Sequence, residues 1–252
     1  MVDMLKVLFA GESWVTHSVH IKGADSFEGS SYHEGGTAFI EALRANNIAV
    51  TYQPCHVAAE AFPFEIDELS TYDVVILSDI GANTFLLSQR TAVHSQLAPN
   101  RLELIREFVL AGGGLLMVGG YLTFQGIGAK ANYKGSPVEE VLPVRLQAGD
   151  DRHEMPQGAK PSITDTDHPA VAGLADWPHF LGYNRSTLAP GADLLATIAG
   201  DPFIAVAKPG RGRSAIFSSD CGPHWGPPEF LAWDGYPRLW TNLVRWLAGP
   251  AT

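Results

Sequence analysis

The chain has 252 residues, of which 46% are hydrophobic, and its 17 basic and 27 acidic residues give a formal net charge of −10. This length and apolar share suffice for one domain with a sizeable core, so we expect a single domain over residues 1–252. The acidic balance argues against nucleic acid and against anionic membranes as partners.

The chain start and the cysteine content bear on the cellular compartment. Residues 1–6 lead directly into a strand-like stretch and lack the basic and apolar regions of a signal peptide. No apolar run approaches the roughly 20 residues of a membrane helix. Two cysteines, Cys55 and Cys221, make no disulfide framework. We therefore expect a cytoplasmic protein without a membrane segment.

Short β-branched runs alternate with amphipathic stretches, a pattern typical of helices that cover both faces of a parallel sheet. After the first strand we expect a long polar loop. Apolar residues at helical spacing predict the first two helices, at 37–47 and 100–111. The first half is expected to contain four strands, at 5–10, 48–52, 72–78 and 115–118.

Beyond Pro143 the pattern loosens into short strands joined by connections rich in proline and glycine. We interpret this half as an excursion that returns to the same sheet and ends in a helix at 236–248. The expected fold is a three-layer α/β sandwich with a mostly parallel, flavodoxin-like sheet. The four strands expected here lie at 144–146, 194–198, 203–207 and 214–218.

In open α/β sheets, ligands bind outside the carboxyl ends of the strands. Polar segments follow four of the expected strands, and we expect them to meet at one rim. These segments are Gly11–Trp14 with His17 and His20; Asp79 with Gly81 and Asn83; Gly119–Tyr121; and Asp220 with Cys221 and His224.

Two blocks resemble the class I glutamine amidotransferase-like superfamily. One runs from Gly112 to Tyr121, with Phe124-Gln125-Gly126 after it. The other runs from Gly210-Arg211-Gly212-Arg213 through Cys221 to the closing helix. The second block also resembles ThuA-like proteins linked to sugar metabolism. The resemblance implies the fold given above.

An amidotransferase of this superfamily carries its nucleophilic cysteine on a sharp turn after the central strand. The corresponding turn here is Gly119-Gly120-Tyr121. Glycine forms no thioester, and a tyrosine hydroxyl with a pKa near 10 is a poor acyl nucleophile. The resemblance therefore implies the fold without glutaminase activity. Tyr121 could donate a hydrogen bond to a bound oxygen, or it could simply cap the strand.

The turn after the last expected strand supplies two further catalytic candidates. ThuA-like relatives hold a histidine in the corresponding turn, so the resemblance implies an acid–base role for His224. Cys221 is a candidate nucleophile because Asp220 and His224 are close in sequence. The alternative is that Cys221 is a small buried hydrophobic residue.

His17 and His20, with Glu12 nearby, make a polar cluster that could bind a divalent metal. The alternatives are a hydrated loop, or an acid–base pair of His17 with His224. The glycines between 119 and 128 lack the dinucleotide fingerprint, so no cofactor is predicted apart from the metal alternative. Substrate-binding candidates are Glu12, Ser13, Asn83, Gly120, Asp220 and Trp225.

Trp177, Trp225 and Trp233 lie in proline-rich loops, where they could seal the loops, stack on a ligand or form a homo-oligomer interface.

Three functions remain open. The first is an enzyme, a hydrolase or a lyase or isomerase, acting on a small sugar or amide. The second is a non-catalytic scaffold, and the third is a Cys221-dependent amidohydrolase. An enzyme predicts that Glu12, His17, Tyr121 and His224 converge in one pocket, and a scaffold predicts that they scatter.

Overall fold

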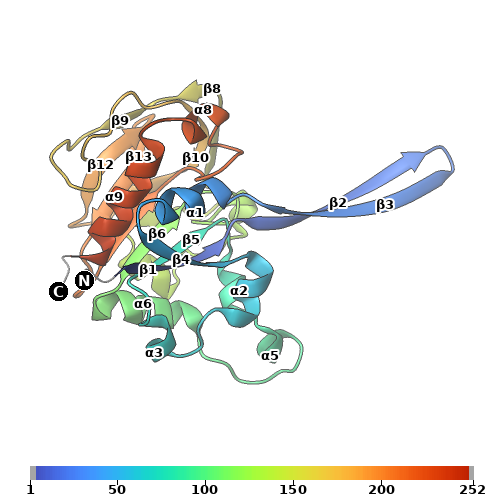
Figure 1. The fold of residues 1–252 in the computed structure, drawn as a ribbon. Helices are drawn as coiled ribbons and strands as arrows, with labels where there is room; N and C mark the ends of the chain where they lie inside the picture. Colours follow the sequence, from blue (N-terminus) through green and yellow to red (C-terminus); the bar gives the residue numbers. More distant parts are fainter. Residues whose placement is uncertain (1–3, 250–252) are drawn as a thin grey trace.

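An eight-stranded sheet lies at the centre of the computed structural model, which describes residues 4–249 (Figure 1). Neighbours from β4 to β14 pair in parallel, and the last three strands join by antiparallel pairing. The expected α/β class with a mostly parallel sheet is confirmed. The order across the sheet is β4 (Ile48–Gln53), β1 (Leu5–Gly11), β5 (Val74–Ser78), β6 (Gly114–Val118), β14 (Arg213–Phe217), β13 (Asp201–Ala207), β12 (Asp193–Ile198) and β9 (Pro161–Ile163).

Two apolar cores sandwich this sheet, because alternate strand residues point to opposite faces. Val7 and Phe9 of β1 pack into one core, together with α1 (Thr37–Arg44) and α9 (Tyr236–Ala248). Leu8 and Ala10 pack into the other, together with α6 (Arg101–Ala111). β5 and β6 are buried along their whole length, as near-continuous apolar runs predict. Figure 1 shows α1 and α9 on one side of the sheet and α6 on the other.

Short elements complete the three layers. The predicted strand at 144–146 forms, but as β7 (Val144–Leu146) it pairs with β11 (Ser186–Leu188) outside the central sheet. A second small ladder joins β8 (Arg152–Ala159) to β10 (Phe180–Asn184). The short helices are α2 (Cys55–Ala61), α3 (Ile66–Leu69), α4 (Ala82–Leu86), α5 (Gln89–Ala92), η1 (Ile127–Ala129), α7 (Pro137–Val141) and α8 (Pro228–Leu231).

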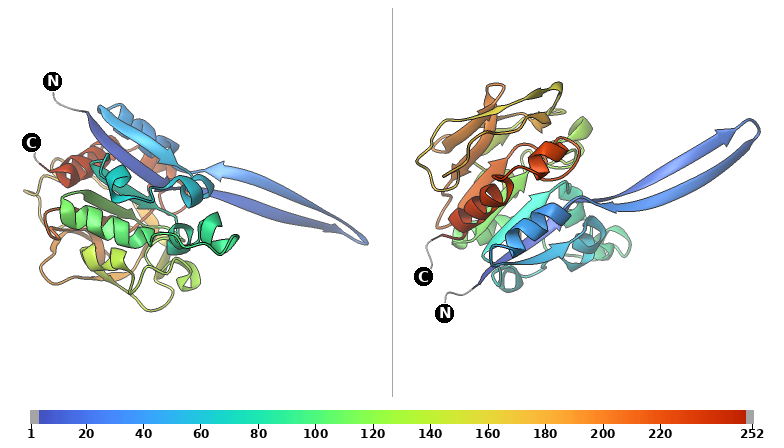
Figure 2. Two further views of the ribbon diagram at one scale, coloured as in Figure 1. Left: turned by 90° about the horizontal axis from the view of Figure 1, so that it is seen from below. Right: turned by 45° about the horizontal axis from the view of Figure 1, so that its top comes forward.

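The expectation of a long polar loop after the first strand is wrong. Residues 13–34 form an antiparallel hairpin of β2 (Ser13–Lys22) and β3 (Asp25–Glu34), which we call the arm. The arm projects far from the body in every view (Figure 1, Figure 2). Apart from the buried Ser13, its residues lie at the surface on both sides of the hairpin, so its sequence lacks the clean alternation that marks a half-buried strand. Gly23, with a φ of +66°, supplies the tight turn.

The helices formed by residues 4–249 include none with both the length and the hydropathy that a bilayer crossing needs.

Candidate functional site

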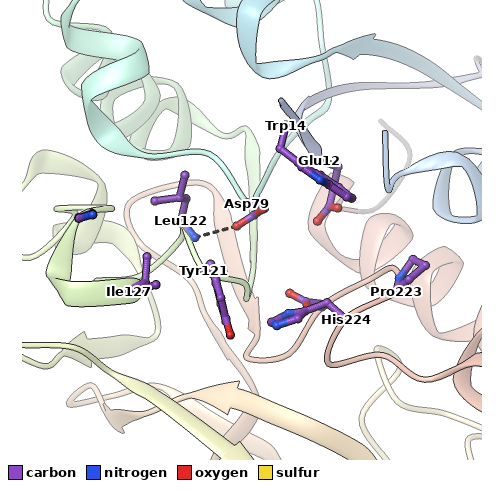
Figure 3. Close-up of a pocket in the computed structure, with 10 residues that line it drawn as sticks. Glu12, Trp14, Asp79, Tyr121, Leu122, Ile127, Pro223 and His224 are labelled. Atoms are coloured by element: carbon purple, nitrogen blue, oxygen red, sulfur yellow. Dashed lines mark hydrogen bonds and ion pairs between the residues drawn. The ribbon is translucent and has the colours of Figure 1, made fainter. Parts of the chain in front are cut away.

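The carboxyl ends of four neighbouring strands, β1, β5, β6 and β14, surround one pocket of about 530 Å³ (Figure 3). A pocket of this size suits a small-molecule ligand. The expected meeting of polar turns at one rim therefore takes place. The residues that line the pocket are Glu12, Trp14, Asp79, Tyr121, Leu122, Ile127, Lys130, Asp220, Pro223 and His224.

Glu12 enters the pocket because the chain bends sharply at the end of β1. Gly11 has a φ of +117°, and a Cβ there would lie 1.7 Å from the carbonyl oxygen of Ser78. That close approach lets the Glu12 N–H donate to the same carbonyl at 2.9 Å. Glu12 itself has a φ of +48°, a strained value of the kind that collects at functional sites. Its Oε1 accepts a hydrogen bond of 2.5 Å from the Ser78 hydroxyl.

All three carboxyl groups that line the pocket, those of Glu12, Asp79 and Asp220, have a pKa raised above the ordinary value, chiefly by burial. Burial, followed by the negative charges of Asp79 and Asp220, raises the pKa of Glu12 to about 8. Burial and the charge of Asp220 raise the pKa of Asp79 to about 6, although the Leu122 N–H donates to its Oδ1 at 2.7 Å. Glu12 is therefore mostly protonated at neutral pH, so it can give up a proton there.

Asp220 and His224 form a hydrogen-bonded pair at the end of β14. His224 Nδ1–H donates to Asp220 Oδ2 at 2.7 Å, and the Trp225 N–H donates to the same oxygen at 2.9 Å. Burial lowers the pKa of His224, but the hydrogen bond to Asp220 and the nearby negative charges outweigh burial, and the pKa is raised. Asp220 thus fixes the imidazole so that Nε2 is the nitrogen left for a ligand.

His224 has a φ of +126°, which is rare for a residue with a side chain. Its ring stacks on Trp225, with ring centroids 5.2 Å apart, and meets the Tyr121 ring edge-on at 4.3 Å. The strained backbone and the two aromatic neighbours hold the imidazole at the pocket wall. Figure 3 shows His224 facing Tyr121 across the lower part of the pocket.

Gly120, directly after β6, lies between two of the carboxyl groups. Its φ is +145°, and a Cβ there would lie 3.0 Å from both Asp79 Oδ1 and Asp220 Oδ1. The missing side chain thus leaves space between the carboxylates. The turn is Gly119-Gly120-Tyr121, so the thiol that an amidotransferase places after this strand is absent from it.

Tyr121 lines the pocket, and its hydroxyl is already bonded. The hydroxyl donates to Glu154 Oε1 at 3.1 Å, and the Arg152 guanidinium lies 4.7 Å from the ring centroid. Trp225 Nε1 donates to the other oxygen of Glu154 at 2.9 Å. A ligand would therefore meet the ring of Tyr121, or would compete with Glu154 for its hydroxyl.

Asn184, which the sequence did not single out, holds the Gly120 turn in place. It is fully buried, its Oδ1 accepts from the Gly120 N–H at 2.8 Å, and its Nδ2 donates to the Gly120 carbonyl at 3.1 Å. The same Nδ2 donates to Asp151 Oδ1 at 2.9 Å. Asn184 is thus a positioning residue for the bend between the two carboxylates.

Asn184→Ala is expected to lower the free energy of unfolding by about 2 kcal/mol, because it leaves buried backbone groups without partners. Chemical denaturation followed by circular dichroism measures the change. Asn242→Ala is the matched control, since Asn242 makes one exposed hydrogen bond, to the Ala172 carbonyl. Equal losses in the two variants would show that Asn184 does not support the turn.

Cys221 lies beneath the pocket floor. Its side chain is 1% exposed, and its Sγ lies 3.6 Å from the Ser78 hydroxyl. Burial and the charge of Glu12 raise the pKa of the thiol well above its usual range. A buried, protonated thiol is a poor nucleophile, so this environment favours the interpretation of Cys221 as a small core residue.

The structure does not bring His17 and His20 to the pocket. Both lie on β2 of the arm, three residues apart, so their side chains point to opposite faces of the strand. His17 Nδ1 pairs with the Ser30 hydroxyl at 2.8 Å, and the His20 ring stacks on Phe27 with centroids 4.6 Å apart. The predicted metal pair is thus separated. Residues 4–249 contain no group of three or more His, Cys, Asp or Glu side chains that could hold a metal ion.

The remaining substrate-binding candidates lie around the pocket without lining it. Ser13 is buried and accepts a hydrogen bond of 2.8 Å from the Cys55 N–H. Asn83 is exposed in the first turn of α4. Trp225 is 1% exposed, behind His224, and Trp177 is 7% exposed, so these tryptophans seal the structure instead of presenting a surface.

Asp79 is the main pocket residue that the sequence placed at the expected rim without assigning it a catalytic or binding role. Its position directly after a buried strand was the signal. Trp14 belonged to the expected rim segment Gly11–Trp14, likewise without an assigned role. Lys130, Ile127 and Pro223 come from irregular segments, whose course the sequence did not predict.

The comparisons with known proteins bear on the family and the fold. The family model described as "Putative glutamine amidotransferase" matches residues 6–249. Two solved structures, the cytoplasmic proteins STM3548 and STM1381 of Salmonella typhimurium, each reach a TM-score of 0.94, at 48% and 45% sequence identity. Each comparison covers 96% of this chain and 99% of the other.

A ThuA-like protein from Parabacteroides merdae reaches a TM-score of 0.57 at 11% identity, over 98% of this chain and 91% of that one. At this identity the likeness shows a shared fold alone. No curated protein matches the chain.

Proposed function

We propose that this chain, which belongs to the family described as "Putative glutamine amidotransferase", is an acid–base enzyme that acts on a small polar molecule without a cysteine nucleophile. One observation carries the proposal. The hydrogen-bonded pair of Asp220 and His224 and the protonated carboxyl of Glu12 line the same pocket. A site that contains both a base and an acid near neutral pH can remove one proton and supply another.

The roles follow from the environment of each group. His224 is the general base, because Asp220 holds its Nδ1–H and leaves Nε2 to accept a proton. Glu12 is the general acid, because burial and its carboxylate neighbours keep it protonated. Reactions of this type are isomerisations and eliminations, in which a base takes a proton from carbon and an acid protonates a carbonyl or a leaving hydroxyl.

The lining of the pocket favours a small sugar or amide as substrate. Trp14 and Tyr121 offer aromatic faces, on which the apolar face of a sugar ring can stack. Acidic groups near the centre suit hydroxyl or amide hydrogens, which need acceptors. The two Salmonella relatives are described as cytoplasmic proteins, and we propose the same compartment for this chain.

Three of the four residues that an enzyme was expected to bring together, Glu12, Tyr121 and His224, line the pocket, and His17 does not. This convergence supports an enzyme over a scaffold. The Cys221-dependent alternative is not favoured, because the thiol is buried and its pKa is raised.

A solvent-exchange screen tests the proposal. The purified chain is incubated in D2O with a panel of sugars, sugar acids and amides, and NMR follows deuterium uptake and product formation. We expect at least one compound to exchange a carbon-bound proton or to be converted. Cys221→Ala is expected to retain that activity, because the thiol takes no part. Binding without exchange or conversion would indicate the scaffold, and activity that Cys221→Ala abolishes would indicate the thiol mechanism.

A further inference from the structure

The arm is the largest feature of the fold that the pocket does not explain. Its two strands, of ten residues each, pair along their whole length and extend away from the body (Figure 1, Figure 2). An isolated two-stranded hairpin is marginally stable in water at best. An arm of this length therefore needs packing that the body of its own chain does not supply.

One face of the arm covers its own aromatic residues. Trp14 stacks on His33, with ring centroids 5.6 Å apart, and His20 stacks on Phe27 at 4.6 Å. The Lys22 ammonium lies 5.8 Å from the Phe27 ring centroid. We call this the covered face, because its large rings have stacking partners within the hairpin, although Trp14 and Phe27 remain 42% and 54% exposed.

The opposite face leaves its apolar residues in solvent, and we call it the open face. Val15, Val19 and Ile21 are 55%, 61% and 74% exposed, and the exposure rises towards the tip. Cross-strand pairing places five pairs on this face: Ser13 with Glu34 at the base, then Val15 with Tyr32, His17 with Ser30, Val19 with Glu28, and Ile21 with Ser26. A row of exposed β-branched residues on a two-stranded ribbon is typical of a contact surface.

We infer that the arm is a dimer interface, in which its open face packs against the open face of the same arm in a second copy of this chain, with the two arms antiparallel. A two-fold axis between the His17 and Val19 positions of β2 lays Val15 of one copy over Ile21 of the other. The antiparallel arrangement also keeps the two bodies at opposite ends, where they do not collide.

Charge complementarity favours this pairing of like faces. The same axis brings Glu28 of one copy diagonally next to His17 of the other, and it does so twice by symmetry. Glu28 and Glu34 are the acidic residues among the five pairs of the open face, and His17 is the imidazole; Glu34, at the base, accepts a hydrogen bond of 2.7 Å from the Tyr32 hydroxyl. Val15 of each copy therefore meets Ile21 of the other, Val19 lies over His17, and each Glu28 carboxylate lies next to an imidazole.

The size of the contact sets its expected strength. A ten-residue strand is about 34 Å long, and a two-stranded ribbon is about 10 Å wide. One face thus offers roughly 300 Å² per copy, below the roughly 800 Å² per partner of a standard interface. We therefore expect a weak dimer that dissociates on dilution.

Sedimentation velocity of the full chain, from roughly 5 to 500 μM, tests the inference in the range where small interfaces associate. We expect a shift from monomer to dimer as the concentration rises. A second chain carries a shortened arm, in which Asn-Gly replaces residues 16–31 between the paired Val15 and Tyr32. It keeps Trp14 and the pocket, and it should remain a monomer throughout. A monomeric full chain, or a dimer that survives the shortening, would overturn the inference.

Point variants and a mixing experiment separate the open face from other contacts. Val19→Lys combined with Ile21→Lys should abolish the dimer, whereas Thr16→Lys, on the covered face, should leave it intact. The full chain mixed with the shortened chain should give no mixed dimer, because the contact needs two arms. A mixed dimer would mean that the arm grips the body of its partner, and it would overturn the pairing of two arms.

Discussion

Turnover by His224→Asn is expected to fall by roughly 10²- to 10⁴-fold, the usual contribution of a general base. Asparagine keeps a polar side chain of similar reach but cannot accept and release the proton. His94→Asn is the matched control, because His94 is exposed and lies outside the pocket. The kcat of both variants is measured on the compound that the screen identifies. Equal activity in the two variants would remove His224 from the mechanism.

Asp220→Asn provides a more specific test, because it acts through His224. The hydrogen bond and the negative charge of Asp220 raise the pKa of His224, so their loss should lower that pKa. The rising limb of the kcat/KM profile, which reports the base in its unprotonated form, should shift to lower pH. The maximal rate should also fall, because the imidazole loses the partner that orients it. An unshifted limb would mean that His224 is not the group that titrates in that limb.

The sheet could be predicted from the sequence because its strands are buried on both faces. Val74–Ser78 and Gly114–Val118 read as near-continuous apolar runs, and such runs leave little choice of structure. The closing helix is equally clear, since its core residues recur at helical spacing and Gly249 ends it. The strand ends then imply the rim at which Glu12, Gly120, Tyr121, Asp220 and His224 gather.

The supports of the site could not be predicted because their partners lie far away in the sequence, and the arm, whose strands pair locally, could not be predicted because no body packs against it. Asn184 reaches Gly120 across 64 residues, and no local pattern announces that contact. Val15, Val19 and Ile21 do alternate, but the polar residues between and around them outweigh that signal when no body packs against the strand. The expected role of His17 failed because it assumed a loop over these residues. Such a loop could have folded back to the rim, whereas His17 lies on a strand of the arm.

Glu12→Gln is expected to stabilise the protein at alkaline pH by about 5 kcal/mol, and to change stability little near pH 4.5. Glu12 has a pKa of about 8 in the folded protein, against an ordinary value of 4.5. Between these two values the folded chain keeps a proton that the unfolded chain releases. The wild-type free energy of unfolding therefore falls as pH rises through this window, and the effect levels off above about pH 8. Glutamine carries no titrating proton, so the variant lacks this component of the decline.

Urea denaturation at several pH values between 4.5 and 9 measures the difference between variant and wild type, which should widen steadily across the window. Glu41→Gln, at an exposed position of α1, is the control, and its difference from wild type should stay small. A difference for Glu12→Gln that does not depend on pH would mean that the buried carboxyl ionises as readily in the folded chain as in the unfolded one. Glu12 could not then be the acid that holds a proton at neutral pH, and the proposed division of labour with His224 would fail even if His224→Asn proved inactive.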